Sequence, residues 1–344
     1  MMKKIIACFL IFLIPVVFLQ SKKLVDLKDS YKAPAGIIDN KHLCIWDQSL
    51  RKIRVFTLWD FKKVSEFGRK GQAPGEFQAI SSVYFKDDCI IVNSYPKICF
   101  FSKKGKLFKE IKFQTNVGNF IPFGKNFIGI SYPYTKPKEE KSKVMYSLFD
   151  SRLNKKREIF LSEIKKYSMP GKTKEILYMI NDRTKAVVSN DRLYIGSTER
   201  GFYFSVFDQN GNNLYEINKN YEKIKITEED KKRKLDEFKK SWGEVTWRQY
   251  NSIYELRVRD YYPAYANFCV DNGKIYVFKY PGEKSQDIII LDIKGNLLKN
   301  KTIPSIKTPG VISHGRFIIK DGLFYYIKDN AETEKWEFHV LHID

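Results

Sequence analysis

The stretch LCIWDQSLRKIRVF at residues 43–56 holds two apolar runs separated by a short polar turn. The runs Leu43–Asp47 and Lys52–Phe56 have the length and the β-branched and aromatic content of two neighbouring β-strands. The same layout recurs at about residues 90–101, 127–150, 193–208, 275–292 and 323–341. Repetition of one strand pair along a chain indicates a fold built from stacked copies of a single unit.

Two kinds of turn punctuate the copies. A polar turn rich in Asn, Asp and Gly precedes the first strand of each pair, at residues 39–41, 86–88, 124–126, 189–191, 271–273 and 320–322. These residue types tolerate the left-handed backbone that tight hairpins need. A second turn follows the pair, as in Lys103-Lys104-Gly105, and leads into a further strand such as Leu107–Ile111. Four strands in about 40–50 residues are typical of one β-propeller blade.

The copies predict an all-β fold, a six-bladed β-propeller spanning residues 22–344. Its inner strands are expected near Ile37, Val83, Ile121, Val187, Phe268 and Phe317. The sixth copy reaches Asp344 one strand short, and Leu24–Leu27 offers the missing strand. We therefore expect Leu24–Leu27 to pair beside Phe338–Leu341 and close the last blade, since an unpaired edge would invite aggregation.

Residues 217–262 do not follow the repeating strand pattern and predict a helical insertion between blades four and five. Thr227 precedes three acidic residues and reads as an N-cap, and Leu235, Phe238 and Trp242 follow at helical spacing. A second amphipathic piece is expected through Val245, Trp247, Ile253 and Leu256. The insertion is either a structural plug packed on the propeller or a lid over a binding site.

Residues 1–21 have the pattern of a signal peptide. Lys3 and Lys4 precede the apolar run Ile5–Leu19, which has about the length of a secretory hydrophobic region. The sequence therefore predicts export to the periplasm or the extracellular space. An uncleaved N-terminal membrane anchor is the alternative.

The formal net charge of +21 comes mainly from Lys residues spread along the whole chain. Sequence-specific nucleic-acid sites favour clustered Arg, so we expect no nucleic-acid partner. The charge favours anionic partners, and an anionic membrane surface is one candidate. Cys44, Cys89, Cys99 and Cys269 lack C-x-x-C spacing, which predicts buried thiols rather than a zinc or redox site, with Cys89 and Cys99 as cross-strand neighbours the alternative. We also expect a monomer.

The segment FGRKGQAPGEF at residues 67–77 resembles the linker between blades in NHL-type propellers, a glycine-rich turn followed by Gly-x-Phe. Ile45–Asp47 with Arg54–Phe56 resembles the strand pair of that family. Only the first blade carries the full pattern. The resemblance implies a six-bladed propeller of the kind found among exported bacterial proteins whose function is not known.

The sequence shows no catalytic residues and calls for no cofactor or metal. Asp208, Asn210 and Asn212 begin like a calcium loop, but Lys219 stands where its final Glu belongs. The enzyme alternative is a calcium-dependent, lactonase-like hydrolase that holds its metal in the central channel. The inner strands offer only Asn119 and Asn267 as evident amide ligands for it.

A non-catalytic binding or scaffolding role in the cell envelope is therefore the favoured interpretation, with a protein, a peptide or an anionic glycan as partner. In a blade, the loop between strands two and three opens on the same side as the connection to the next blade. Three of these loops carry Tyr-Pro, and arginines accompany them, so the candidate binding residues are Tyr95, Tyr132, Tyr280, Arg51, Arg69 and Arg200. Rigid aromatic rings beside arginines suit a binding surface. Repeated Tyr-Pro turn chemistry is the alternative explanation.

Overall fold

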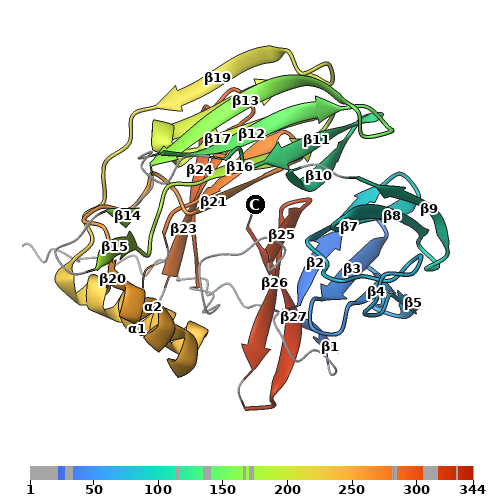
Figure 1. The fold of residues 1–344 in the computed structure, drawn as a ribbon, viewed down its shortest axis with the longest axis horizontal. Coiled ribbons are helices and arrows are strands. Elements are labelled where there is room, and N and C mark those ends of the chain that lie inside the picture. Colours follow the sequence, from blue (N-terminus) through green and yellow to red (C-terminus); the bar gives the residue numbers. More distant parts are fainter. Residues whose placement is uncertain are drawn as a thin grey trace, which may run out of the picture.

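The computed structural model describes residues 22–27, 34–113, 116–134, 141–165, 168–169, 174–280, 282, 285–304, 317–330 and 332–343. Six four-stranded antiparallel sheets are arranged around a central channel as the blades of a propeller (Figure 1). Blades one to three comprise β2 (Ala35–Ile38), β3 (His42–Asp47), β4 (Lys52–Thr57) and β5 (Lys63–Phe67); β6 (Ser82–Lys86), β7 (Cys89–Ser94), β8 (Lys97–Ser102) and β9 (Leu107–Lys112); and β10 (Val117–Phe123), β11 (Asn126–Ser131), β12 (Lys141–Phe149) and β13 (Lys155–Lys165).

Blades four and five comprise β16 (Thr184–Ser189), β17 (Arg192–Ser197), β18 (Phe202–Phe207) and β19 (Asn213–Lys219); and β21 (Asn267–Asp271), β22 (Lys274–Phe278), β23 (Ser285–Asp292) and β24 (Leu297–Pro304). The sixth comprises β25 (Phe317–Lys320), β26 (Leu323–Asn330), β27 (Lys335–His342) and β1 (Lys22–Leu27). Each blade runs from its inner to its outer strand in chain order, except at β1. The predicted fold and all six predicted inner strands are confirmed.

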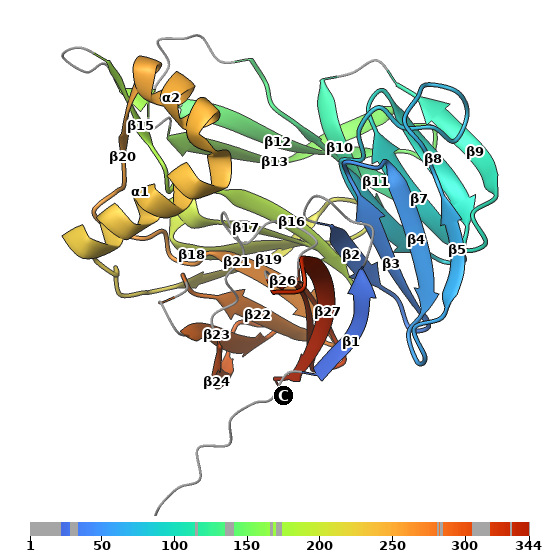
Figure 2. The same cartoon turned by 90° about the horizontal axis from the view of Figure 1, so that it is seen from below.

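The N-terminal strand closes the ring as predicted. Strand β1 pairs antiparallel with β27, and Val25 is the Cα partner of Phe338 while Leu27 is the partner of Trp336. Figure 2 shows the two strands side by side although more than three hundred residues separate them in the chain. Leu24 packs at the margin of the cluster that includes Phe338.

The hydrophobic core lies between the blades. Successive side chains of a strand point to opposite faces of its sheet, so a blade that is apolar on both faces must pack against both neighbours. Six buried clusters among the described residues follow this rule. They join consecutive blades around Cys44 and Ile90, Ile98 and Phe127, Ile128 and Leu193, Val206 and Ile275, Ile290 and Phe324, and Ile327 and Leu43.

Aromatic rings fill much of this interior because glycines make room for them. Gly129 on β11 and Gly196 on β17 stand in the middle of their strands, where a side chain would normally project into the core. A Cβ at Gly129 would collide with the Phe149 ring, and one at Gly196 would collide with the Tyr265 hydroxyl. Close packing of the neighbouring rings therefore depends on both glycines.

The insertion after blade four forms two helices, α1 (Glu228–Trp242) and α2 (Glu244–Ile253). The Thr227 side chain accepts a hydrogen bond of 3.1 Å from the Asp230 N–H, which confirms the predicted N-cap. The second predicted helical piece ends earlier than expected. Leu256 lies in a strand, β20 (Tyr254–Arg257), because that segment pairs in parallel with β15 (Glu175–Tyr178). With β14 (Ser168–Met169) they form a small sheet that the sequence did not predict.

The stretch that begins like a calcium loop is a repeated β-turn. The Asp208 carboxylate accepts hydrogen bonds from the backbone N–H of Asn210 at 2.9 Å and from that of Asn212 at 2.8 Å. The turns Asp150–Asn154 and Asp292–Asn296 repeat this geometry between the third and fourth strands of their blades. In all three turns, hydrogen bonds from the Asn four residues on hold the pKa of the Asp carboxyl below its ordinary value of 3.8.

These turns predict a loss of stability in acid. A carboxyl whose pKa is lowered by folding stabilises the fold fully above its unfolded pKa of about 4, and that contribution is lost as the pH falls through the folded pKa. We expect the triple variant Asp150→Asn, Asp208→Asn, Asp292→Asn to lose less stability than the wild type between about pH 6 and about pH 3. Urea unfolding at both pH values measures this. An equal acid-induced loss in both proteins would contradict it.

Candidate functional site

The six predicted site residues lie on one side of the propeller. Because strands alternate in direction, the turns between second and third strands open on the same side as the connections between blades. We call this side the loop face and the opposite side the far face. Tyr95, Tyr132, Tyr280 and Arg51 lie in or next to such turns; Arg200 lies in the short helix η1 (Thr198–Arg200), and Arg69 lies in a connection. Figure 2 shows α1 and α2 together at one side of the ring, next to β15 and β20.

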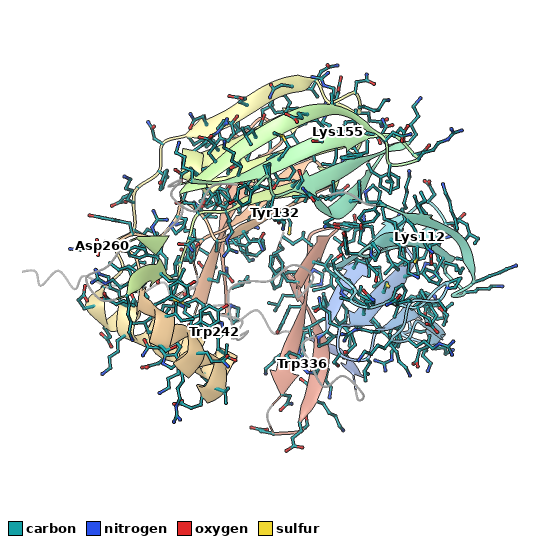
Figure 3. All side chains as sticks on the ribbon, in the orientation of Figure 1. Lys112, Tyr132, Lys155, Trp242, Asp260 and Trp336 are labelled. Carbon is teal, nitrogen blue, oxygen red and sulfur yellow. The ribbon has the colours of Figure 1, made fainter. Side chains whose placement is uncertain are left out.

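Tyr95 and Tyr132 are exposed. The Tyr95 ring rests edge-to-face on Phe113 at 5.6 Å between ring centroids. Tyr132 is 65% exposed, and Figure 3 shows it near the centre of the ring of blades. Both rings are therefore available to a ligand.

Tyr280 has a different environment. Its ring stacks on Tyr262 of the insertion at 4.6 Å between centroids. Its hydroxyl is buried and has no hydrogen-bond partner among the described residues, and burial raises the pKa of Tyr280 to about 12. Tyr280 belongs to the contact between blade five and the insertion rather than to an open surface.

Each of the three arginines contacts its own neighbouring residues, at separate points of the ring. Arg51 Nε donates to the Gln78 carbonyl at 2.8 Å, which ties the first blade's turn to the next connection. Arg69 pairs with Glu76 at 2.5 Å. The Arg200 guanidinium lies 4.7 Å from the Phe160 ring centroid. The structure thus brings the predicted residues to one face without gathering them into one pocket.

The two helices of the insertion differ in how they pack, and the sequence left open whether the insertion is a structural plug or a lid. Helix α1 packs Leu235 and Phe238 against the small buried cluster of Ile180, Ile226 and Val258, as a structural plug would. Helix α2 buries no residue.

Exposed apolar side chains remain on α2. Val245 is 72% and Ile253 is 59% exposed, and Tyr250 is also exposed. The Tyr250 ring packs on Trp242 of α1 at 4.8 Å between centroids. Figure 3 places Trp242 on the helix pair, apart from the centre of the ring.

The central channel contains a cavity of about 500 Å³, lined by the inner strands of blades one to four and by residues next to them. Its polar lining includes a chain in which Ser82 Oγ donates to Asn119 Oδ1 at 2.6 Å and Asn119 Nδ2 donates to the Tyr84 hydroxyl at 3.1 Å. Lys185 on β16 also lines the cavity, and its Nζ donates to Asn267 Oδ1 and to the Phe268 carbonyl, each at 2.8 Å.

The sequence interpretation noted Asn119 and Asn267 but missed Lys185. The signal was present, because Lys185 stands within the inner strand predicted near Val187. Burial in this position lowers the pKa of the Lys185 ammonium.

The cavity does not fit the calcium-dependent alternative. That chemistry needs several carboxylate and amide oxygens around the metal. The described residues that line the cavity include no carboxylate, and Lys185 would repel a cation there. Across the described part of the chain, no three His, Cys, Asp or Glu side chains lie in a metal-binding arrangement. The four described cysteines are free thiols.

Comparisons with known proteins support the fold. No family model matches the chain, including any for the NHL-type propellers that its first blade resembles. No curated protein matches it in sequence. A solved structure from Bacteroides fragilis, described as a candidate exported protein, superposes with a TM-score of 0.53 at 14% identity over 94% of each chain.

Two further solved structures have lower TM-scores. The WD40 domain of Pan2 from Neurospora crassa gives 0.44 at 10% identity over 94% of this chain and 96% of that one. A Bacteroides caccae protein of unknown function gives 0.41 at 9% identity over 80% and 81%. At such identities the likeness to the Bacteroides fragilis structure concerns the fold alone. Within the described residues, no helix is long and apolar enough to cross a bilayer.

The contrast between Tyr280 and Tyr132 can be measured. Replacing Tyr280 by Ala removes a stacked, half-buried ring and should lower the free energy of unfolding by about 2 kcal/mol or more. Tyr132→Ala, at an exposed position, should change it by about 0.5 kcal/mol or less. Urea unfolding followed by fluorescence distinguishes them. Equal, small effects would show that Tyr280 is a surface residue after all.

Proposed function

We propose that this protein is a non-catalytic binding propeller, exported to the cell envelope, whose loop face binds an acidic protein segment. The main observation that supports this proposal is the exposed apolar surface of α2, formed by Val245, Tyr250 and Ile253. Tyr250 lies five residues after Val245 and three before Ile253, so the three occupy one broad side of the helix. Exposed aliphatic and aromatic side chains in one patch favour a protein contact.

Charge and neighbouring residues favour an acidic partner. The chain carries a net charge of +21, which attracts acidic surfaces at long range. Tyr95 and Tyr132 add exposed rings elsewhere on the same face. An anionic glycan would also meet aromatic rings and cations, but it would gain less from the aliphatic side chains of Val245 and Ile253.

The start of β1 would orient the loop face if the protein were anchored to a membrane at its N-terminus. Strand β27 runs from the loop face at Lys335 to the far face at His342, and β1 runs back beside it. Lys22 therefore lies at the far face. A membrane anchor in residues 1–21 would attach there and leave the loop face directed away from the bilayer, towards a soluble or surface-bound partner.

The experiment compares two matched sets of substitutions in the exported protein. The loop-face variant carries Val245→Ser and Ile253→Ser. The control carries Trp59→Ser and Leu297→Ser, which are exposed apolar residues at far-face turns. We expect the loop-face variant to bind the partner, captured from envelope extract and then purified, at least about 10-fold more weakly, because it loses the central apolar contacts.

The control should bind like the wild type, and both variants should keep the wild-type melting curve. Binding that is equal in the loop-face variant and the wild type would overturn the assignment of this face. Retention of a sulfated or uronic-acid glycan, with no protein partner, would instead show that the partner class is wrong.

A further inference from the structure

We propose that the central channel binds a small organic anion, with a carboxylate or phosphate group at Lys185. This site goes beyond the proposed function, since the helix surface of α2 does not contribute to the cavity. The volume of about 500 Å³ is within the range of about 300–1,000 Å³ typical of small-molecule sites.

The first argument is the charge of Lys185. Its ammonium has three N–H donors, and two of them meet the neutral oxygens of Asn267 and Phe268. Among the described residues, the titratable and charged groups that act on it are Cys269 on β21 and Arg183, immediately before its own strand. Neither is a carboxylate. The part-buried ammonium thus meets only neutral oxygens and the Phe268 ring among the described residues, and an anion in the cavity would supply a counter-charge.

The second argument is an unpartnered donor on a residue that lines the same cavity. Trp46 lines the cavity and is only 5% exposed, and its indole N–H has no acceptor among the described residues. Buried N–H groups normally find a partner. An indole N–H donates only, so it requires an acceptor oxygen, as the lysine does.

The remaining lining describes the rest of the ligand. Ile37, Val83 and Ile121 supply apolar walls, while Tyr84 and Asn119 offer a hydroxyl and an amide. A compact anion with an apolar or aromatic body fits these walls better than a fully hydrated ion. Tyr132, exposed on the loop face, also lines the cavity and marks that side as the entrance.

Protonation gives the site a signature of its own. Burial lowers the pKa of Lys185, and a bound anion favours the charged ammonium and raises that pKa again. Binding at a pH near or above that lowered pKa should therefore take up protons. Affinity should be greatest while the ammonium is protonated and should fall as the pH rises through the lowered pKa.

The test is calorimetric titration of the purified protein with inorganic phosphate, phenyl phosphate, benzoate and citrate at constant ionic strength. At least one probe should bind. Binding of the two phosphate probes would identify a phosphate site, and binding of benzoate or citrate would identify a carboxylate site. Lys185→Gln should weaken that binding at least about 30-fold, and Lys185→Arg, which keeps the charge, should retain part of it. Trp46→Phe should weaken it several-fold.

The matched control is Lys125→Gln, at an exposed far-face turn, which should bind like the wild type. Titration in two buffers of different ionisation enthalpy, repeated as the pH is raised towards the lowered pKa of Lys185, should show proton uptake that grows with pH for the wild type and is absent for Lys185→Gln. If Lys185→Gln fails to fold, the proposal is tested by proton uptake in the wild type and by the affinities of the Trp46→Phe and Lys185→Arg variants. Absence of binding by all four probes at millimolar concentration, or equal binding by Lys185→Gln, overturns the proposal and leaves partner capture by α2 unaffected.

Discussion

The structure depends on one constraint: no blade has a hydrophobic core of its own. Each sheet packs both faces against its neighbours, so the six buried clusters form a closed circle in which every blade contributes to two. An open ring would expose two apolar sheet faces to water. The pairing of β1 with β27 joins the two ends of the chain in one blade and makes the circle complete.

The ring also creates both candidate sites. Inner strands from four blades converge on the channel, which places Asn119 and Lys185 around one cavity with Trp46 of the neighbouring strand β3, although the three are far apart in the sequence. The connections between blades, in contrast, are free to lengthen without disturbing the clusters. The α1–α2 insertion uses this freedom at the loop face, where α1 packs inward and α2 exposes apolar side chains.

Much of the fold could be predicted because its signals are local. Strand alternation, turn residues and the Thr227 cap each occupy a few consecutive positions. The pairing of β15 with β20 could not be predicted, since parallel pairing between segments almost eighty residues apart leaves no local pattern. Tyr280 has the same Tyr-Pro sequence pattern as Tyr95, but its neighbour Tyr262 comes from the insertion, so the sequence could not show that it is covered. Lys185 could have been predicted as a channel residue, because a charged side chain in a predicted inner strand is visible in the sequence.

Hydrogen exchange tests ring closure most directly. If β1 is an integral strand of the sixth blade, its amides bonded to β27 should exchange only when the whole ring unfolds. In mass spectrometry, peptides from residues 22–27 and 335–342 should then share a slow class with the same dependence on denaturant. Exchange of all amides in residues 22–27 at least about 100-fold faster than the slow class of β27 would show that the strand frays independently, and would contradict the closed ring.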